Sequence, residues 1–133
     1  MDDDVALRRV QALARQQAAE SRQAAVLLQQ FAADAVAAGI EPERLTARGY
    51  RSKSRYRTQV TGWYLRLDRS VGVGTDGAFY VLTAPDGLRS RLSGVTVAPK
   101  DPPLELGRGG RDGESMPLTE AIAKRLDPTW RPN

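Results

Sequence analysis

The order of apolar and polar positions divides the chain into a helical first third and a middle part with short β-type segments. Residues 5–38 contain no Gly or Pro and are rich in Ala, Leu, Arg, Gln and Glu, the residues with the strongest helix propensity. Asp2 to Asp4 place negative charge at the positive end of the helix dipole, and Gly39 with Pro42 marks the end of the segment. The pattern therefore predicts one long helix over residues 5–38.

This predicted helix is long for a chain of 133 residues. Residues 5–38 would span roughly 50 Å at about 1.5 Å per residue, whereas a compact domain of this size is roughly 36 Å across. We therefore expect the helix either to break near residues 15–22 or to extend beyond its domain.

A heptad assignment that begins at Leu7 gives the helix a seam that is apolar at both ends and polar at Gln17 and Ser21. Such a seam fits an amphipathic helix packed on its own core, and it also fits contact with a second chain. Our first hypothesis for function is a non-catalytic interaction module that self-associates through this helix, or binds another protein with it. The seam residues considered for that contact are Leu7, Val10, Ala24, Leu28, Phe31 and Ala35.

Three short segments after the helix are rich in β-branched and aromatic residues: residues 59–67, 70–74 and 78–84. The dipeptides Asp68-Arg69, Asp76-Gly77 and Asp86-Gly87 mark turns, so these segments predict an antiparallel meander. Trp63, Leu65 and Leu67 share the more apolar face of the first segment, which we expect to face the helix. A further strand is expected around residues 94–98.

The remaining segments complete an α+β fold. Residues 40–57 are interpreted as a basic connector with a short helical turn around residues 43–47, and residues 99–116 as a Pro- and Gly-rich loop. Residues 117–126 predict a short helix, followed by a mobile tail over residues 127–133. We expect a single domain: a long N-terminal helix packed on a small antiparallel sheet of about three to five strands (residues 58–98), with a short C-terminal helix.

Composition excludes several kinds of active site. The chain has no His and no Cys, which removes the Ser-His-Asp triad, cysteine nucleophiles and thiolate zinc sites. We therefore expect no catalytic residues, no metal and no cofactor. The sequence has no apolar run long enough to span a bilayer and begins with acidic residues instead of a basic signal region, so we predict a cytoplasmic protein without a membrane partner.

The net charge of +4 is unevenly distributed. Residues 1–43 carry −3, residues 44–69 carry +7, and residues 70–133 are neutral. Arginine and lysine can neutralise phosphates, and tyrosine can stack on an unpaired base, so the basic segment of residues 44–57 is a candidate nucleic-acid or polyanion contact. In an extended segment, its cations from residue 51 to residue 57 would project on one side. The candidate residues are Arg44, Arg48, Tyr50, Arg51, Lys53, Arg55, Tyr56 and Arg57.

Three other interpretations of this basic segment stay open. It could be a solvated surface, it could pair with the acidic N-terminal third of the same chain, or it could bind an acidic protein. A high arginine content is also typical of GC-rich genomes, so the arginine count alone does not indicate nucleic-acid binding.

Two glycine-rich segments resemble phosphate-binding loops. Residues 72–77 match the pattern GxGxxG, which in dinucleotide-binding folds opens a helix. Residues 78–83 have the composition of a strand instead, so we predict a hairpin turn. Gly107 to Ser115 is interpreted as a surface loop, with an anion site beside Arg108 and Arg111 as the alternative.

Residues 51–118 resemble a group of small uncharacterised proteins of high-GC actinobacteria. The resemblance is carried by the GWYL segment (62–65), the DGAFYVL segment (76–82) and the GRDGESMPL segment (110–118). It implies one structural unit from the basic connector to the C-terminal helix, and it implies no activity.

Overall fold

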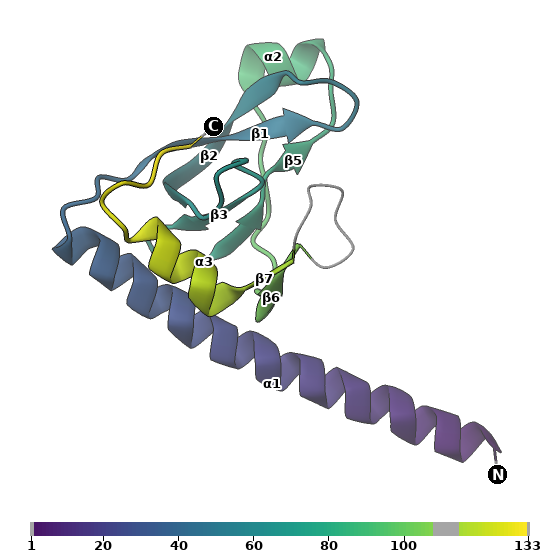
Figure 1. The fold of residues 1–133 in the computed structure, drawn as a ribbon. Coiled ribbons are helices and arrows are strands. Elements are labelled where there is room, and N and C mark those ends of the chain that lie inside the picture. The colour runs from purple at the N-terminus through teal and green to yellow at the C-terminus, as the bar shows by residue number, and fades with distance from the viewer. Residues whose placement is uncertain (1, 108–114, 133) are drawn as a thin grey trace.

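The computed structural model describes residues 2–107 and 115–132, which form an α+β fold with one projecting helix (Figure 1). The sequence prediction of this fold class is confirmed. The helices are α1 (Asp2–Ala37), α2 (Leu88–Ser93) and α3 (Leu118–Arg125). The strands are β1 (Glu43–Gly49), β2 (Arg55–Tyr64), β3 (Val71–Gly74), β4 (Phe79–Val81), β5 (Thr83–Ala84), β6 (Glu105–Leu106) and β7 (Met116–Pro117).

The main sheet has the strand order β4-β3-β2-β1-β5. All neighbours are antiparallel except β1 and β5, which run parallel. The long strand β2 connects the two halves of the sheet, because it pairs with β1 from Arg55 to Gly62 and with β3 from Gly62 to Tyr64. The short strands β6 and β7 form a separate antiparallel pair that leads into α3.

The C-terminal half of α1 is held against the sheet by aromatic packing. Phe31 meets Trp63 of β2 edge to face, with ring centroids 5.8 Å apart and an interplanar angle of 82°. Trp63 is fully buried, and its indole Nε1 donates a hydrogen bond of 2.9 Å to the carbonyl oxygen of Ile40, just after the helix. Gly39 has a φ of 76°, so it ends α1 in the left-handed conformation that the sequence predicts.

Two hydrophobic clusters lie within the domain. The first joins α1 to β2, β3 and α3, and includes Leu28, Phe31, Trp63, Leu65 and Leu118. The second contains Leu45, Val60, Tyr64 and Leu82 from the sheet strands and the loop before β5. Both faces of β2 are therefore buried near its end. The expected contact with the helix is observed for Trp63, Leu65 is buried in the same cluster, and Leu67 is exposed.

The N-terminal half of α1 extends beyond the domain (Figure 1). All residues from Asp2 to Glu20 are exposed, and the first partly buried residue is Ser21. This overhang of nineteen residues is about 28 Å long at about 1.5 Å per residue. Of the two expectations for a helix of this length, overhang is observed and a break near residues 15–22 is not.

The basic connector predicted over residues 40–57 is a β-hairpin, and the helical turn expected around residues 43–47 does not form. Leu45 and Ala47 are buried while Arg44 and Arg48 are exposed, which is the alternation of a strand with one buried face. Residues 43–47 are extended because they pair with β2, which lies later in the sequence. The local Glu41-Pro42 pattern carries no information about this pairing.

Two further segments differ from their predictions. Residues 95–97 form no regular strand: Val95 donates to the carbonyl of Arg57, and the side chain of Gln59 bonds both the N–H and the carbonyl of Val97. The described part of the tail, residues 127–132, is not free of the domain. Trp130 packs on the second cluster and on the guanidinium of Arg125, 3.9 Å from its ring centroid.

The GxGxxG segment is a hairpin turn, as predicted. Residues 72–74 belong to β3 and residues 75–77 to the turn that leads to β4, and these strands pair antiparallel through Val73 and Phe79. A Cβ added to Gly62 of β2 would lie 1.9 Å from the carbonyl oxygen of Val73 in β3. The close approach of these two strands therefore requires glycine at position 62.

Replacing Phe31 by Ala should lower the free energy of unfolding by about 3–5 kcal/mol, because it leaves a cavity against Trp63. Val26→Ala is the matched control, since Val26 lies on the same helix and is 68% exposed; its effect should stay within about 0.5 kcal/mol. Urea denaturation measures both values. Similar effects of the two substitutions would contradict the packing described.

Candidate functional site

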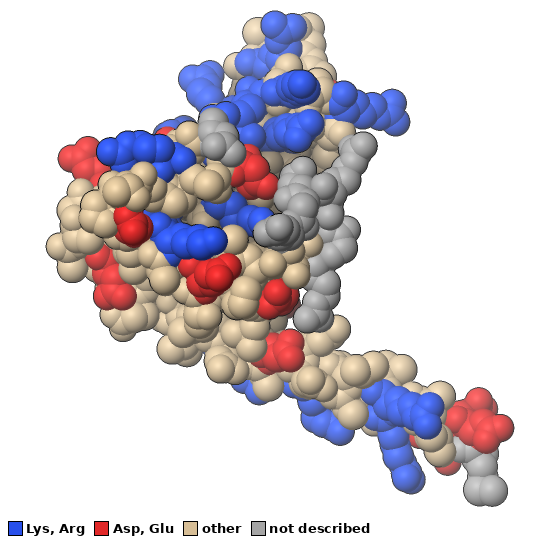
Figure 2. Space-filling model, viewed as in Figure 1, with Lys and Arg blue, Asp and Glu red and all other residues tan. Residues whose placement is uncertain are grey.

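Lysine and arginine side chains gather where the β1–β2 hairpin and α2 form the upper part of the molecule (Figure 2). We call this surface the basic lobe. Its residues are Arg44, Arg48, Arg51, Lys53, Arg55 and Arg57 of the hairpin, Arg69 of the β2–β3 turn, and Arg89 and Arg91 of α2.

The register of the hairpin brings arginines of both strands onto one face. Arg48 of β1 lies opposite Arg55 of β2, and Thr46 lies opposite Arg57. Like charges directly opposite each other destabilise an antiparallel pair. The hairpin therefore places positive charges together at an electrostatic cost.

Arg55 differs from its neighbours because it is partly buried and held by the backbone. It donates to the hydroxyl and the carbonyl oxygen of Thr46, each at 2.6 Å, and to the carbonyl oxygen of Arg69 at 3.2 Å. Burial, followed by the charge of Arg69, lowers the pKa of the Arg55 guanidinium from its ordinary value. Arg55 thus supports the hairpin, while Arg48 and Arg57 are exposed.

One carboxylate, that of Asp86, attaches the hairpin tip to the segment before α2. It accepts hydrogen bonds from the backbone N–H of Arg51 at 2.8 Å, from the hydroxyl of Tyr56 at 2.7 Å, and from the hydroxyl of Ser52. The hydrogen bond from Ser52, then that from the Arg51 amide, holds the pKa of Asp86 below its usual range. A Cβ on Gly49 would lie 1.9 Å from an Asp86 oxygen, so this arrangement requires glycine at position 49.

The basic residues are not neutralised by acidic residues of the described chain. No arginine or lysine of the basic lobe forms an ion pair with another residue in the ranges 2–107 and 115–132, and the ion pair observed there joins Lys124 to Glu120 at 3.8 Å. The interpretation that residues 44–57 pair with the acidic N-terminal third is therefore wrong, since α1 carries its first-turn acids away from the domain (Figure 1).

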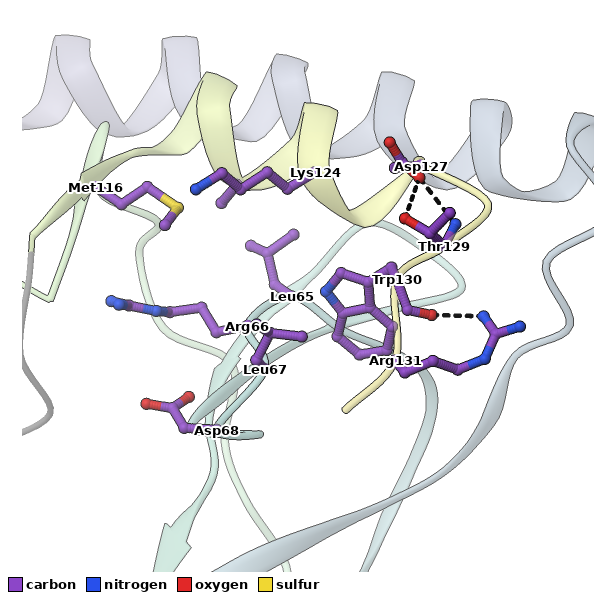
Figure 3. Close-up of a pocket in the computed structure, with 11 residues that line it drawn as sticks. Leu65, Arg66, Leu67, Asp68, Met116, Lys124, Asp127, Thr129, Trp130 and Arg131 are labelled. Atoms are coloured by element: carbon purple, nitrogen blue, oxygen red, sulfur yellow. Dashed lines mark hydrogen bonds between the residues drawn. The ribbon is translucent and has the colours of Figure 1, made fainter. Parts of the chain in front are cut away.

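A second feature is a cavity of about 560 Å³ between the end of β2, α3 and the tail (Figure 3). Trp130 projects its indole into this cavity towards Leu65 and Leu67, and charged side chains stand at its margin (Figure 3). Arg125, beneath Trp130, donates to the carbonyl of Tyr64 at 2.7 Å, and burial lowers its pKa. The volume is in the range of small-molecule sites. However, every buried side-chain nitrogen and oxygen atom of the described residues already has a hydrogen-bond partner.

The described residues contain no cluster of three carboxylates that could hold a metal ion. Within the same ranges, no helix is both long and apolar enough to cross a membrane. The possible anion site beside Arg108 and Arg111 lies outside the described residues.

Comparison with models of known protein families, with curated proteins and with solved structures gives no match. The resemblance to actinobacterial proteins stays a prediction.

The seam residues proposed for self-association fall into a buried group and an exposed group. Ala24, Leu28, Phe31 and Ala35 are buried in the core of their own chain, so they cannot serve a contact with a second chain. Leu7 and Val10 are exposed on the overhang, together with Leu13. Of the basic candidates, Tyr56 is buried and Arg55 is engaged by backbone oxygens, whereas Tyr50 is 66% exposed.

Sequence reasoning missed Arg69, Arg89, Arg91 and Asp86 as members of this site. The arginines lie outside the basic segment, and only the fold of residues 69–91 onto the hairpin brings them near it. Asp86 was predicted as a turn residue, and no local pattern connects it to residues 51–56.

Asp86→Asn should loosen the hairpin tip, because a neutral amide is a weaker acceptor than a carboxylate. The Arg51 amide should exchange its hydrogen faster in this variant, as measured by NMR. Asp76→Asn is the matched control, since Asp76 accepts from Ala78 in the β3–β4 turn. It should speed exchange at Ala78 and leave Arg51 unchanged.

The same hydrogen bonds should depend on pH in a defined direction. Because the pKa of Asp86 is lowered in the fold, its contribution is fully present above the ordinary carboxyl value of 3.8 and is lost as the pH falls through the lower folded value. Protection of the Arg51 amide that declines already well above pH 3.8 would contradict this assignment.

Proposed function

We propose that this protein is a non-catalytic interaction module that self-associates through the overhang of α1. The observation that carries the proposal is a helical segment, residues 2–20, in which every residue is exposed and several large apolar side chains face solvent. Leu7, Val10 and Leu13 are exposed by 55%, 62% and 59%.

The overhang repeats the pattern of apolar residues that the C-terminal half of α1 buries against the domain; we call this row of residues the apolar stripe. Eighteen residues make about five turns of an α-helix, so residues separated by eighteen positions lie on the same side. Val10 precedes Leu28 by this spacing, and Leu13 precedes Phe31. The buried residues are Ala24, Leu28, Phe31, Ala32 and Ala35, and their equivalents on the overhang are Ala6, Val10, Leu13, Ala14 and Gln17.

This repeat favours a partner on the overhang. An isolated helix of about 19 residues is only marginally stable in water, and packing of an apolar stripe is the usual source of its stability. In the C-terminal half the sheet and α3 supply that packing. A second helix would supply it for residues 6–17, and the small side chains of Ala6 and Ala14 would allow a close approach.

The acidic first turn favours an antiparallel over a parallel pair of two copies. The first turn carries Asp2, Asp3 and Asp4, while Arg22 lies near the domain. Antiparallel pairing centred near residue 12 brings Asp2 of each copy opposite Arg22 of the other and Val10 opposite Ala14, and it also brings Asp4 opposite Glu20 and Arg9 opposite Arg15. A parallel pair would place acidic turns together. The partner helix would also end where the domain begins, so the two domains would not collide.

Self-association is tested by analytical ultracentrifugation over about 1–500 μM. The interface is small, so we expect a dissociation constant on the order of micromolar, with the mass rising from 14.5 kDa towards twice that value. Val10→Asp/Leu13→Asp should remain monomeric, because it places two charges on the stripe.

The matched control is Ala12→Asp/Ala19→Asp, which adds the same charges to the opposite side of the same overhang. This control should still form the dimer. A monomeric wild-type protein throughout the range, or equal behaviour of the two variants, would disprove the proposal. Substitutions at Leu28 or Phe31 are unsuitable for this test, since both side chains are in the core.

A further inference from the structure

We propose that the basic lobe binds single-stranded nucleic acid, with its arginines on phosphates and Tyr50 stacked on a base. This proposal does not rest on self-association, because the lobe and the overhang share no residue.

The groove in the lobe has arginines on both of its margins. It has a volume of about 420 Å³ and lies between the hairpin tip and α2, with Arg51 on one side and Arg91 on the other. Tyr56 lines this groove, and side chains alternate along a strand, so the exposed Arg48 and Arg57 lie on the opposite face of the hairpin. The positive charge therefore covers both faces of the hairpin and is not limited to one point.

The repulsion between Arg48 and Arg55 points to an anionic ligand. The two residues are paired directly opposite each other in the β1–β2 ladder, and no acidic residue of the described chain forms an ion pair with either. Arg55 is fixed by three hydrogen bonds, while Arg48 is exposed. A phosphate between them would offset the repulsion and release bound counterions.

Asp86 is the acidic residue in this groove, and its oxygens already accept hydrogen bonds from Arg51, Ser52 and Tyr56. Its carboxylate therefore serves to position the tip. The bonds hold Arg51 next to α2 and leave the ring of Tyr50 in solvent.

Single-stranded nucleic acid fits this surface better than other anionic partners. Tyr50 offers a stacking surface among cations, which suits unpaired bases. Helix α2 has six residues, too few for a recognition helix in a major groove. A flat bilayer that meets the exposed Leu88 and Leu92 would contact α2 and its arginines, but would not follow the positive face that runs along the strands.

Fluorescence anisotropy with labelled single-stranded DNA and RNA oligonucleotides tests the proposal. If about four phosphates are contacted, affinity should fall about 50-fold between about 50 and 200 mM salt. Arg48→Glu/Arg57→Glu removes two contacts, so binding should weaken and the salt effect should fall to about sevenfold. Tyr50→Ala should weaken binding about tenfold.

Lys100→Glu/Lys124→Glu is the control for net charge, because both lysines are exposed outside the lobe. It should retain wild-type affinity within about twofold. Circular dichroism checks that the Arg48→Glu/Arg57→Glu variant is folded. If it is not, Arg48→Gln/Arg57→Gln repeats the test by removing the two positive charges without reversing them.

Three results would overturn the proposal. The first is an absence of binding at the lower salt concentration, where electrostatic contact is strongest. The second is an equal loss of affinity in the lysine control. The third is binding to vesicles of phosphatidylserine without binding to either oligonucleotide, which would make the lobe a membrane contact.

Discussion

The contact between Phe31 and Trp63 is the constraint on which the rest of the structure depends. It fixes the C-terminal half of α1 on β2, and the indole hydrogen bond to Ile40 fixes the chain where it leaves the helix. The stripe that packs on the sheet runs from Ala24 to Ala35, which is all that a domain of this size covers. The remaining helix must extend into solvent, because the sequence before Ser21 contains no residue that would end it.

A second, smaller constraint organises the opposite part of the molecule. Asp86 connects a hairpin tip to the segment before α2, and Gly49 leaves room for its carboxylate. A single acidic residue thereby keeps the positively charged tip of the hairpin next to α2. Within the hairpin, Arg48 and Arg55 lie opposite each other at an electrostatic cost, so the basic lobe is more informative than its charge count alone.

The two proposed surfaces lie at separate ends of the protein, with the overhang on one side and the hairpin with α2 on the other (Figures 1 and 2). Their combination has a physical consequence. An antiparallel dimer would carry two basic lobes, and a strand long enough to reach both would bind the second lobe at a raised effective concentration. A weak electrostatic contact would then become a tighter one without additional side chains.

The sequence by itself determined the long helix, its glycine stop, the β3–β4 hairpin and the α+β class, because these depend on local propensity and on alternation over a few residues. It also located the excess positive charge. Only the tertiary structure decided that residues 43–49 form a strand, that Leu28 and Phe31 belong to the core, and that Arg69, Arg91 and Asp86 join the basic segment. These outcomes depend on pairing between residues far apart in the chain. The 18-residue repeat in α1 was present in the sequence. Which of its two apolar stripes packs on the sheet is decided by the position of Trp63 relative to the end of the helix.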